Sequence, residues 1–219
     1  KIISFIAYTS LVIGLLIISI ISVSTSINIL ILVAACCFLG YLYQGPPFRF
    51  GYQGLGEPLC WLAFGPFAYS AVLIALNPSN IYFEDIPWKV SLLLGSGPSL
   101  ATTLVLFCSH FHQISEDKKH GKNSPLVRLG AKKGSQFVPW IIFTIYIFQL
   151  FTIVTGFIPV FCILYLISFP QAIRLINLLR SSYKKPSAIK NCKFIAIKFQ
   201  TLNGVGLITG LIFNYLLNK

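Results

Sequence analysis

Residues 109–130 read SHFHQISEDKKHGKNSPLVRLG, between an apolar run that starts near residue 88 and another at 136–155. Each run is long enough to cross the hydrocarbon core of a bilayer as a helix, which takes about 20 residues. The segment between them is short and charged, as is typical of a loop at a membrane surface. It contains Glu116 and Asp117, two of the five acidic residues of the chain. The pattern predicts two membrane-spanning helices joined by a polar turn.

The same alternation continues along the whole chain. Hydrophobic residues make up 56% of the sequence and charged residues 10%, whereas a soluble domain averages about 25% charged residues. Apolar runs of spanning length lie at 3–22, 27–43, 58–76, 88–112, 136–155, 157–180 and 194–217. We therefore predict an all-α fold, a polytopic transmembrane helix bundle with seven spans in a lipid bilayer.

The distribution of positive charge supports this map. If successive loops alternate between the two sides, all but two of the 17 Lys and Arg residues fall on one side, and Lys89 and Lys219 fall on the other. Membrane proteins show this bias because positive loops stay on the side where the chain is made. The two ends of the chain are then expected on opposite sides. Topology accounts for the net charge of +12, so no nucleic-acid partner is expected.

Gln113, Glu116 and Asp117 form a candidate metal site. Spacings of three and four residues place side chains on one face of a helix. An amide oxygen and two carboxylates are hard ligands suited to Mg²⁺, which usually takes one or two protein carboxylates together with substrate phosphates. The alternative is a solvated helix end, where the acids pair with Lys119 or Lys122.

Basic residues follow these acids directly. They can neutralise a diphosphate, which an arginine binds bidentately, and they are Lys118, Lys119, Lys122 and Arg128. The alternative is contact with anionic lipid at the positive face. His112 lies four residues before Glu116 and could meet it on a helix. His110 and His112 point to different helical faces, so a zinc pair is not expected.

A second polar segment, residues 41–58, reads YLYQGPPFRFGYQGLGEP. Its glycines Gly51, Gly54 and Gly56 allow tight backbone turns. The neighbouring tyrosines can line an apolar pocket that tolerates a cation. The alternative is a rigid interfacial loop with an aromatic belt.

At these two segments the sequence resembles a known family. Residues 43–58 and 108–130 are similar to the plant and cyanobacterial dihydroxynaphthoate phytyltransferases, which are UbiA-type intramembrane prenyltransferases of phylloquinone (vitamin K1) synthesis. The long matches cover roughly 40–70 and 107–131, and elsewhere the likeness is mainly the pattern of spans. The resemblance implies a bundle of nine transmembrane helices around a central cavity. Two acidic motifs face each other there and hold Mg²⁺ and a prenyl diphosphate.

The resemblance also implies where this chain lies within that fold. The seven spans would be helices three to nine, forming one transmembrane prenyltransferase domain over residues 1–219. The first acidic motif, of the Asn-Asp-x-x-Asp kind, would lie before Lys1, so we expect the chain to be an N-terminally truncated piece. Residues 113–117 would be the second acidic motif, with Asp117 at its last aspartate.

The resemblance assigns roles to individual residues. Catalytic residues would be Asp117, Glu116, Gln113 and Tyr43, and the first three of these would also bind the metal. Substrate-binding residues would be Lys122, Arg128, Lys118, Arg49, Tyr52, Glu57 and His112.

The activity that the resemblance implies is Mg²⁺-dependent transfer of a phytyl group from phytyl diphosphate to 1,4-dihydroxy-2-naphthoate, in a chloroplast (plastid) membrane. Three alternatives stay open: a catalytically incomplete fragment or relic, a prenyltransferase for another aromatic acceptor such as homogentisate, and a transporter. The spans hold almost no ionisable residues at mid-depth, which disfavours a transporter. The Gln-Gly-Pro-Pro and His-Phe-His-Gln stretches favour the naphthoate branch.

Overall fold

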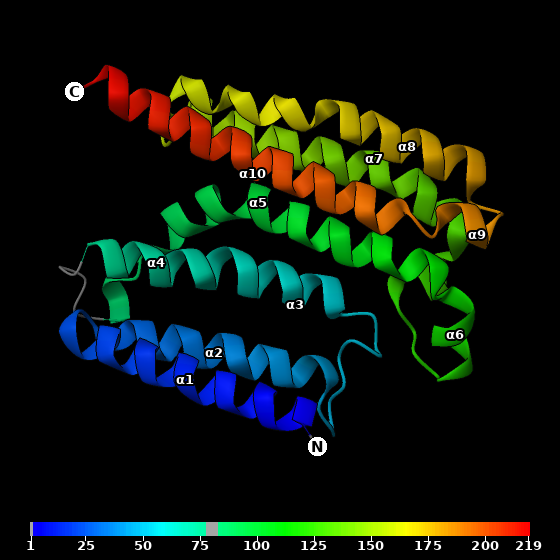
Figure 1. Cartoon of the computed structure of the whole chain (residues 1–219), viewed down its shortest axis with the longest axis horizontal. Helices are drawn as coiled ribbons and strands as arrows, with labels where there is room; N and C mark the ends of the chain where they lie inside the picture. Colours follow the sequence, from blue (N-terminus) through cyan, green and yellow to red (C-terminus); the bar gives the residue numbers. More distant parts are fainter. Residues whose placement is uncertain (1, 78–82) are drawn as a thin grey trace.

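The computed structural model describes residues 2–77 and 83–219, and over those residues the chain is a bundle of long helices joined by short turns (Figure 1). The first part comprises α1 (Ile2–Ser24), α2 (Ile27–Gln44), α3 (Gly56–Leu62), the π-helical turn η1 (Ala63–Phe67), α4 (Ala68–Leu76), the short 3₁₀ helix η2 (Phe83–Asp85) and α5 (Trp88–Ser109). The second part comprises η3 (His110–His112), α6 (Ile114–Lys119), α7 (Pro125–Val154), the 3₁₀ segment η4 (Val160–Ser168), α8 (Phe169–Ser182), α9 (Pro186–Ile189) and α10 (Cys192–Leu217).

The seven predicted spans are confirmed. Within the described residues, seven helical segments are long and apolar enough to cross a membrane. Two of them begin earlier than predicted, at Pro125 and Ser187, because their first turns are polar and a hydropathy pattern detects only the apolar part of a helix. Pro125 is well placed to begin α7, since proline at the first helical position lacks only an N–H that would be unpaired anyway. Gly130, with φ 76° and ψ 159°, then interrupts α7 after its first turn.

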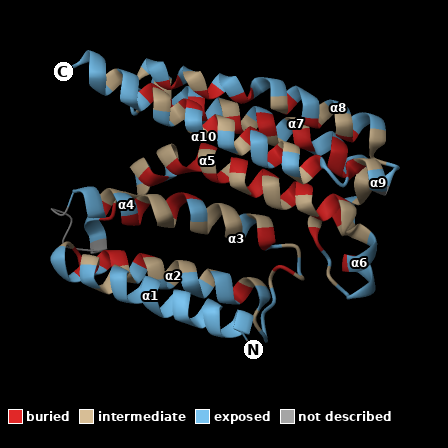
Figure 2. Ribbon diagram, viewed as in Figure 1, coloured by how far each residue is buried: buried red, intermediate tan, exposed pale blue. Residues whose placement is uncertain are grey.

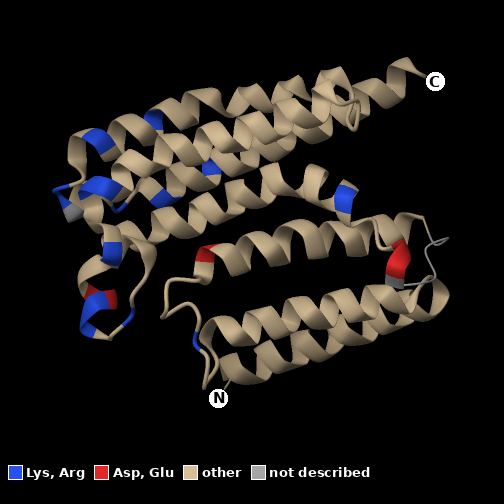
Figure 3. Ribbon diagram, turned by 180° about the vertical axis from the view of Figure 1, so that it is seen from behind, with Lys and Arg blue, Asp and Glu red and all other residues tan. Residues whose placement is uncertain are grey.

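The predicted sidedness is confirmed for the described residues. Figure 3 shows Lys and Arg gathered at the end of the bundle that carries α6, while few lie at the opposite end. Ile2 and the C-terminus lie at opposite ends of the bundle (Figure 1), as expected for an odd number of spans. Lys1 and residues 78–82, in the loop before α5, lie outside the described residues.

Helix α5 is the centre of the bundle. Half of the residues in its most apolar stretch are buried inside the bundle, compared with 6% of those in α1. It packs against α7 and α10 on one side and against α3, η1 and α4 on the other. One core cluster lies between α5, α7, α8 and α10, and includes Leu104, Phe107, Val138, Ile145, Leu175 and Phe199. A smaller cluster joins α2 to α4 and comprises Ile29, Leu32, Ala71, Ile74 and Ile86.

The outer surface of the bundle is apolar. Figure 2 shows buried residues on the facing sides of the helices and exposed residues around the outside. Many exposed side chains are large and hydrophobic, for example Ile3, Val23 and Phe143. Such a surface is unfavourable in water but suits lipid chains, because the helical backbone satisfies its own hydrogen bonds. The apolar exterior and the seven spans make the chain a multi-pass integral membrane protein.

Polar pairs join helices inside the bundle. Gln149 of α7 and Asn203 of α10 exchange two hydrogen bonds, of 2.6 and 3.0 Å. Ser70 of α4 donates to Ser91 of α5 at 2.7 Å. Interhelical bonds of this kind contribute about 0.6 kcal/mol each on average in membranes. They therefore fix which faces meet more than they determine overall stability.

Helix α10 approaches the η4 segment very closely through Gly206. A Cβ atom at Gly206 would overlap the backbone carbonyl of Leu164 and lie 2.7 Å from the Cα of Tyr165. At Gly204, on the same helix, a Cβ atom would meet nothing within 4 Å. Small residues allow this kind of backbone contact between membrane helices.

We expect Gly206→Ala to destabilise the protein and Gly204→Ala to leave its stability unchanged or slightly raised. The added methyl group at position 206 must push two backbones apart, which costs about 1–3 kcal/mol for an overpacked site. At position 204 alanine only removes the helix penalty of glycine, about 1 kcal/mol. Thermal unfolding of both variants in detergent checks this, and equal unfolding temperatures would contradict the close packing of α10.

Candidate active site

Charged and polar side chains gather at the positively charged end of the bundle. We call this group the charged cluster, and its members are Glu57, His110, Asp117, Lys122 and Ser124. Glu57 Oε1 lies 3.3 Å from His110 Nδ1, and His110 Nε2 lies 3.3 Å from Lys122 Nζ. Lys122 Nζ lies 3.4 Å from Asp117 Oδ2, which also accepts a 3.1 Å hydrogen bond from Ser124 Oγ. One ammonium group thus links two carboxylates, directly to Asp117 and through the imidazole to Glu57.

The turn after α6 brings Lys122 back to Asp117. The backbone N–H of Lys122 donates to the carbonyl of Asp117 at 2.8 Å. Gly121 makes this reversal possible, because its φ of 69° lies in the left-handed region that other residues rarely adopt. Ser124, two residues after Lys122, is the N-cap residue of α7. The short sequence between α6 and α7 therefore positions three members of the charged cluster.

The two adjacent acids of α6 face different surroundings. Asp117 and Lys122 have 11% and 12% of their side-chain surface exposed. Glu116 pairs with Lys119 at 3.2 Å, and these side chains are 60% and 70% exposed. The structure thus brings Asp117 into the charged cluster and turns Glu116 to the surface.

Among the described residues, the side chains of Gln113, Lys118 and His112 make no hydrogen bond or ion pair with the Asp117 side chain. Gln113 is half-buried at the N-cap of α6, where its carbonyl accepts the N–H of Asp117 at 2.7 Å. Lys118 is exposed. His112 is half-buried in η3. Among neighbouring charges, Lys193 and Lys190 affect it most, and not Glu116, as its spacing suggested.

Arg128 connects the two polar segments. Its Nη2 donates to the backbone carbonyl of Gln53 at 2.5 Å, and the N–H of Asn123 donates to the carbonyl of Tyr52 at 2.7 Å. Gly54 lies between these bonds with φ 79°, and a Cβ atom there would lie 2.7 Å from the Asn123 carbonyl. The loop before α3 is thereby fixed against the loop before α7. Arg128 is itself exposed, so part of its guanidinium group remains accessible to a ligand.

Tyr43 lies between the charged cluster and the interior of the bundle. Its ring fills the space beside two glycines, since a Cβ atom would lie 3.1 Å from it at Gly51 and 2.7 Å from it at Gly56. The charges of Glu57 and Asp117 both act on its hydroxyl group. Two further predicted residues lie in the loop that follows, where the Arg49 guanidinium is 5.8 Å from the centre of the Tyr52 ring.

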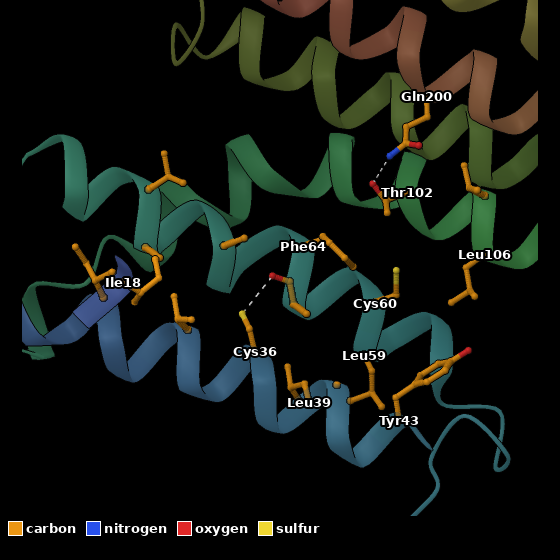
Figure 4. Close-up of a pocket in the computed structure, with 18 of the residues that line it drawn as sticks. Ile18, Cys36, Leu39, Tyr43, Leu59, Cys60, Phe64, Thr102, Leu106 and Gln200 are labelled. Carbon is orange, nitrogen blue, oxygen red and sulfur yellow. Dashed lines mark hydrogen bonds between the residues drawn. The ribbon is translucent and has the colours of Figure 1, made fainter. Parts of the chain in front are cut away.

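A large apolar cavity begins at Tyr43 and extends along the bundle. Its volume is about 950 Å³, near the upper end of the range for small-molecule sites, about 300–1,000 Å³. Figure 4 shows Tyr43 and Ile18 at opposite ends of it. The lining is almost entirely aliphatic, aromatic or small, with polar or sulfur atoms from Cys36, Tyr43, Cys60, Thr102, Ser109 and Gln200. Gln200 donates to Thr102 at 2.7 Å (Figure 4).

Sequence reasoning missed His110 and Ser124. His110 is almost fully buried, although its sequence neighbours are polar, and a buried imidazole needs a polar partner. The available signal was its position at the end of an apolar run, directly before the acidic segment. The cavity was also missed, because most residues that line it are ordinary apolar residues and they come from seven different helical segments.

The fold and the site define an intramembrane protein in which an apolar cavity ends beside a buried group of charged side chains. Residues 3–197 match the UbiA prenyltransferase family, and the chain belongs to this family. The membership confirms the fold class and the family resemblance inferred from residues 43–58 and 108–130.

Two curated relatives are similar over most of the chain. A 2-carboxy-1,4-naphthoquinone phytyltransferase of Synechocystis sp. is 37% identical over 183 residues, which cover 84% of this chain and 57% of the relative. The chloroplastic 2-carboxy-1,4-naphthoquinone phytyltransferase of Arabidopsis thaliana is 38% identical over 191 residues, 86% of this chain and 50% of the relative. The chain spans about half the length of these relatives. No solved structure matches it.

We expect Lys122→Gln to destabilise the folded protein far more than Lys119→Gln. Removing one partner of a buried ion pair leaves an uncompensated charge and costs about 3–5 kcal/mol. An exposed pair such as Glu116–Lys119 contributes only about 0–1 kcal/mol. Thermal unfolding in detergent compares the same substitution at the two sites, and similar losses at both would argue against a buried charged cluster.

Proposed function

We propose that this chain forms the active-site part of a prenyltransferase that transfers a phytyl group from phytyl diphosphate to 1,4-dihydroxy-2-naphthoate. The observation that carries the proposal is the junction at Tyr43 between the charged cluster and the apolar cavity. A prenyl diphosphate has the same two parts, a highly charged head and a long apolar tail. The similarity to phytyltransferases over most of the chain supports the choice of phytyl donor and naphthoate acceptor. The chloroplastic relative supports a plastid membrane.

The diphosphate head would bind at the loops beside the charged cluster. Lys122 offers an ammonium group that is already desolvated, and such a group interacts more strongly with an anion than one in water. Arg128 offers the free part of a planar guanidinium, suited to two phosphate oxygens at once. Its bond to the carbonyl of Gln53 holds the side chain in place before the donor arrives. Both residues would take up charge as the diphosphate leaves.

The residues present fit a magnesium ion that is shared with the substrate. Among the described residues, no group of three His, Cys, Asp or Glu could hold a metal by itself. Mg²⁺ usually binds through one or two carboxylates and completes its shell with water and substrate phosphates, and Asp117 offers such a carboxylate. Bound there, the ion would neutralise charge on the leaving diphosphate.

The phytyl tail would lie in the apolar cavity. Ala71 of α4 lines the cavity and follows Glu57 by fourteen residues along an almost continuous helical path. At 1.5 Å per residue this distance is roughly 21 Å, enough for a long isoprenoid chain. Removing the apolar tail from water also provides binding energy far from the reacting carbon, which an enzyme can use to orient the head group.

Tyr43 would stabilise the reacting end of the donor. The C–O bond to the diphosphate breaks, its electron pair leaves with the diphosphate, and positive charge develops on the allylic carbon. An aromatic face stabilises a nearby cation, and the apolar lining beyond Tyr43 excludes water that would capture it. The ring carbon of the acceptor that bears the carboxylate then forms the new C–C bond, and the carboxylate leaves as CO₂.

The direct test is product formation in membranes that contain the chain in the longest form its gene encodes. We expect phytyl diphosphate and 1,4-dihydroxy-2-naphthoate to give a prenylated naphthoquinol and CO₂, and we expect a chelator to stop the reaction. Asp117→Ala should abolish most of the transfer, whereas Glu84→Ala, an exposed acid at the other end of the bundle, should not. Full transfer by the Asp117→Ala variant would remove Asp117 from the mechanism.

The cavity also predicts a change in donor choice. Ala71→Leu adds volume deep in the cavity, so we expect it to reduce transfer from phytyl diphosphate more than transfer from the shorter geranyl diphosphate. Ala34→Leu is the matched control, because Ala34 is exposed on α2 and does not line the cavity. The measurement is the ratio of rates with the two donors, and an unchanged ratio in the Ala71→Leu variant would place the tail elsewhere.

A further inference from the structure

We propose that Glu57, held by His110, is the base that accepts a proton from a ring hydroxyl group of the aromatic acceptor. The inference rests on the proposed function and assigns the acceptor side of the same site. It starts from the hydrogen bonding of Glu57, which the donor side of the mechanism does not use.

The carboxylate of Glu57 is buried and lacks a hydrogen-bond donor. Both of its oxygens are inaccessible to solvent and make no hydrogen bond within the described residues, and only 12% of the side chain is exposed. His110 Nδ1 is 3.3 Å from Oε1, but its N–H is not aligned for a hydrogen bond. Buried carboxylate oxygens are normally satisfied, because leaving them unpaired is costly. The carboxylate of Glu57 therefore has unused hydrogen-bonding capacity, which a donor from a ligand would satisfy.

The neighbours of His110 fix its protonation pattern. An ammonium group has only hydrogen-bond donors, so the contact between Lys122 Nζ and His110 Nε2 makes Nε2 the acceptor. In the neutral imidazole the proton is then on Nδ1, the nitrogen that faces Glu57. We assign this tautomer from the contacts. The protonated nitrogen of the imidazole thus lies beside the carboxylate of Glu57 and packs against it.

Glu57 lies where the cavity meets the charged cluster. The preceding residue, Gly56, lies beside the Tyr43 ring, which is 2.7 Å from where its Cβ atom would be. Leu59 and Cys60, two and three residues after Glu57 on α3, line the cavity. A ligand that reaches Glu57 from this side must be apolar over most of its surface and carry a proton donor at one edge. A hydroxylated aromatic ring meets this description, whereas an ionised diphosphate has no proton to donate to the carboxylate.

The proton transfer completes the chemistry of the acceptor. Glu57 takes the hydroxyl proton, and the electron pair of that O–H bond increases electron density on the ring. The ring carbon attacks the allylic carbon of the donor, the carboxylate leaves as CO₂, and the ring oxygen recovers the proton from Glu57. Protons balance over the cycle, and no oxidant or reductant is needed. A positioned base of this kind contributes about 10²–10⁴-fold to a rate.

The test uses Glu57→Gln in the longest form of the protein, with Glu84→Gln as the matched control at an exposed glutamate. We expect Glu57→Gln to lower kcat with the naphthoate by about 10²–10⁴-fold while leaving the affinity for a non-reactive phytyl thiodiphosphate unchanged. Glu84→Gln should match the wild type in both measurements. Thermal unfolding of each variant in detergent confirms that the comparison is between folded proteins.

Two further variants separate a base from a structural carboxylate. Glu57→Ala should regain part of its rate when formate is added, because formate can occupy the vacated space and accept the proton. His110→Asn, which keeps an N–H directed at Glu57, should lose less activity than His110→Leu.

The possible failures are distinct. A Glu57→Gln variant with wild-type kcat would overturn the role of Glu57, as would one that loses donor affinity to the same extent as activity. A Glu57→Ala variant that formate does not rescue would also count against a base at this position. Absence of phytyl transfer by the wild-type protein would instead overturn the proposed function, and this inference with it.

Discussion

The ion pair between Lys122 and Asp117 is the interaction on which the polar end of this molecule depends. Both side chains are largely buried, and burying a carboxylate is costly unless a cation and hydrogen bonds compensate for lost water. The same ammonium group reaches His110 and through it Glu57. The turn between α6 and α7, η3 and the first turn of α3 are therefore tied to a single positive charge.

Around this point the molecule separates two environments over a short distance. The charged cluster lies on one side of Tyr43, and a cavity lined almost entirely by apolar side chains lies on the other. Glycines at 51 and 56 leave space for the Tyr43 ring. A substrate with one charged and one apolar part can bind both environments at once. Contacts at both ends then fix its position along the cavity.

The sequence predicts the spans and their sidedness well, because hydropathy and positive charge are local properties that act residue by residue. It predicts the side chains of the acidic segment less well. The spacing argument places Gln113, Glu116 and Asp117 on one helical face, but neighbouring residues of an α-helix lie about 100° apart around its axis. The rotational phase of α6 also depends on η3, the 3₁₀ turn that precedes it. Asp117 then faces inward and Glu116 outward. Neither this phase nor the partners of His110 can be read from spacing alone.

Helix α5 ends directly at His110, and it is also the helix that both halves of the bundle share. A displacement of the last turn of α5 would move the imidazole and would change its position relative to Glu57. The alignment of the imidazole with Glu57 thus depends on how α5 packs between the two halves of the bundle.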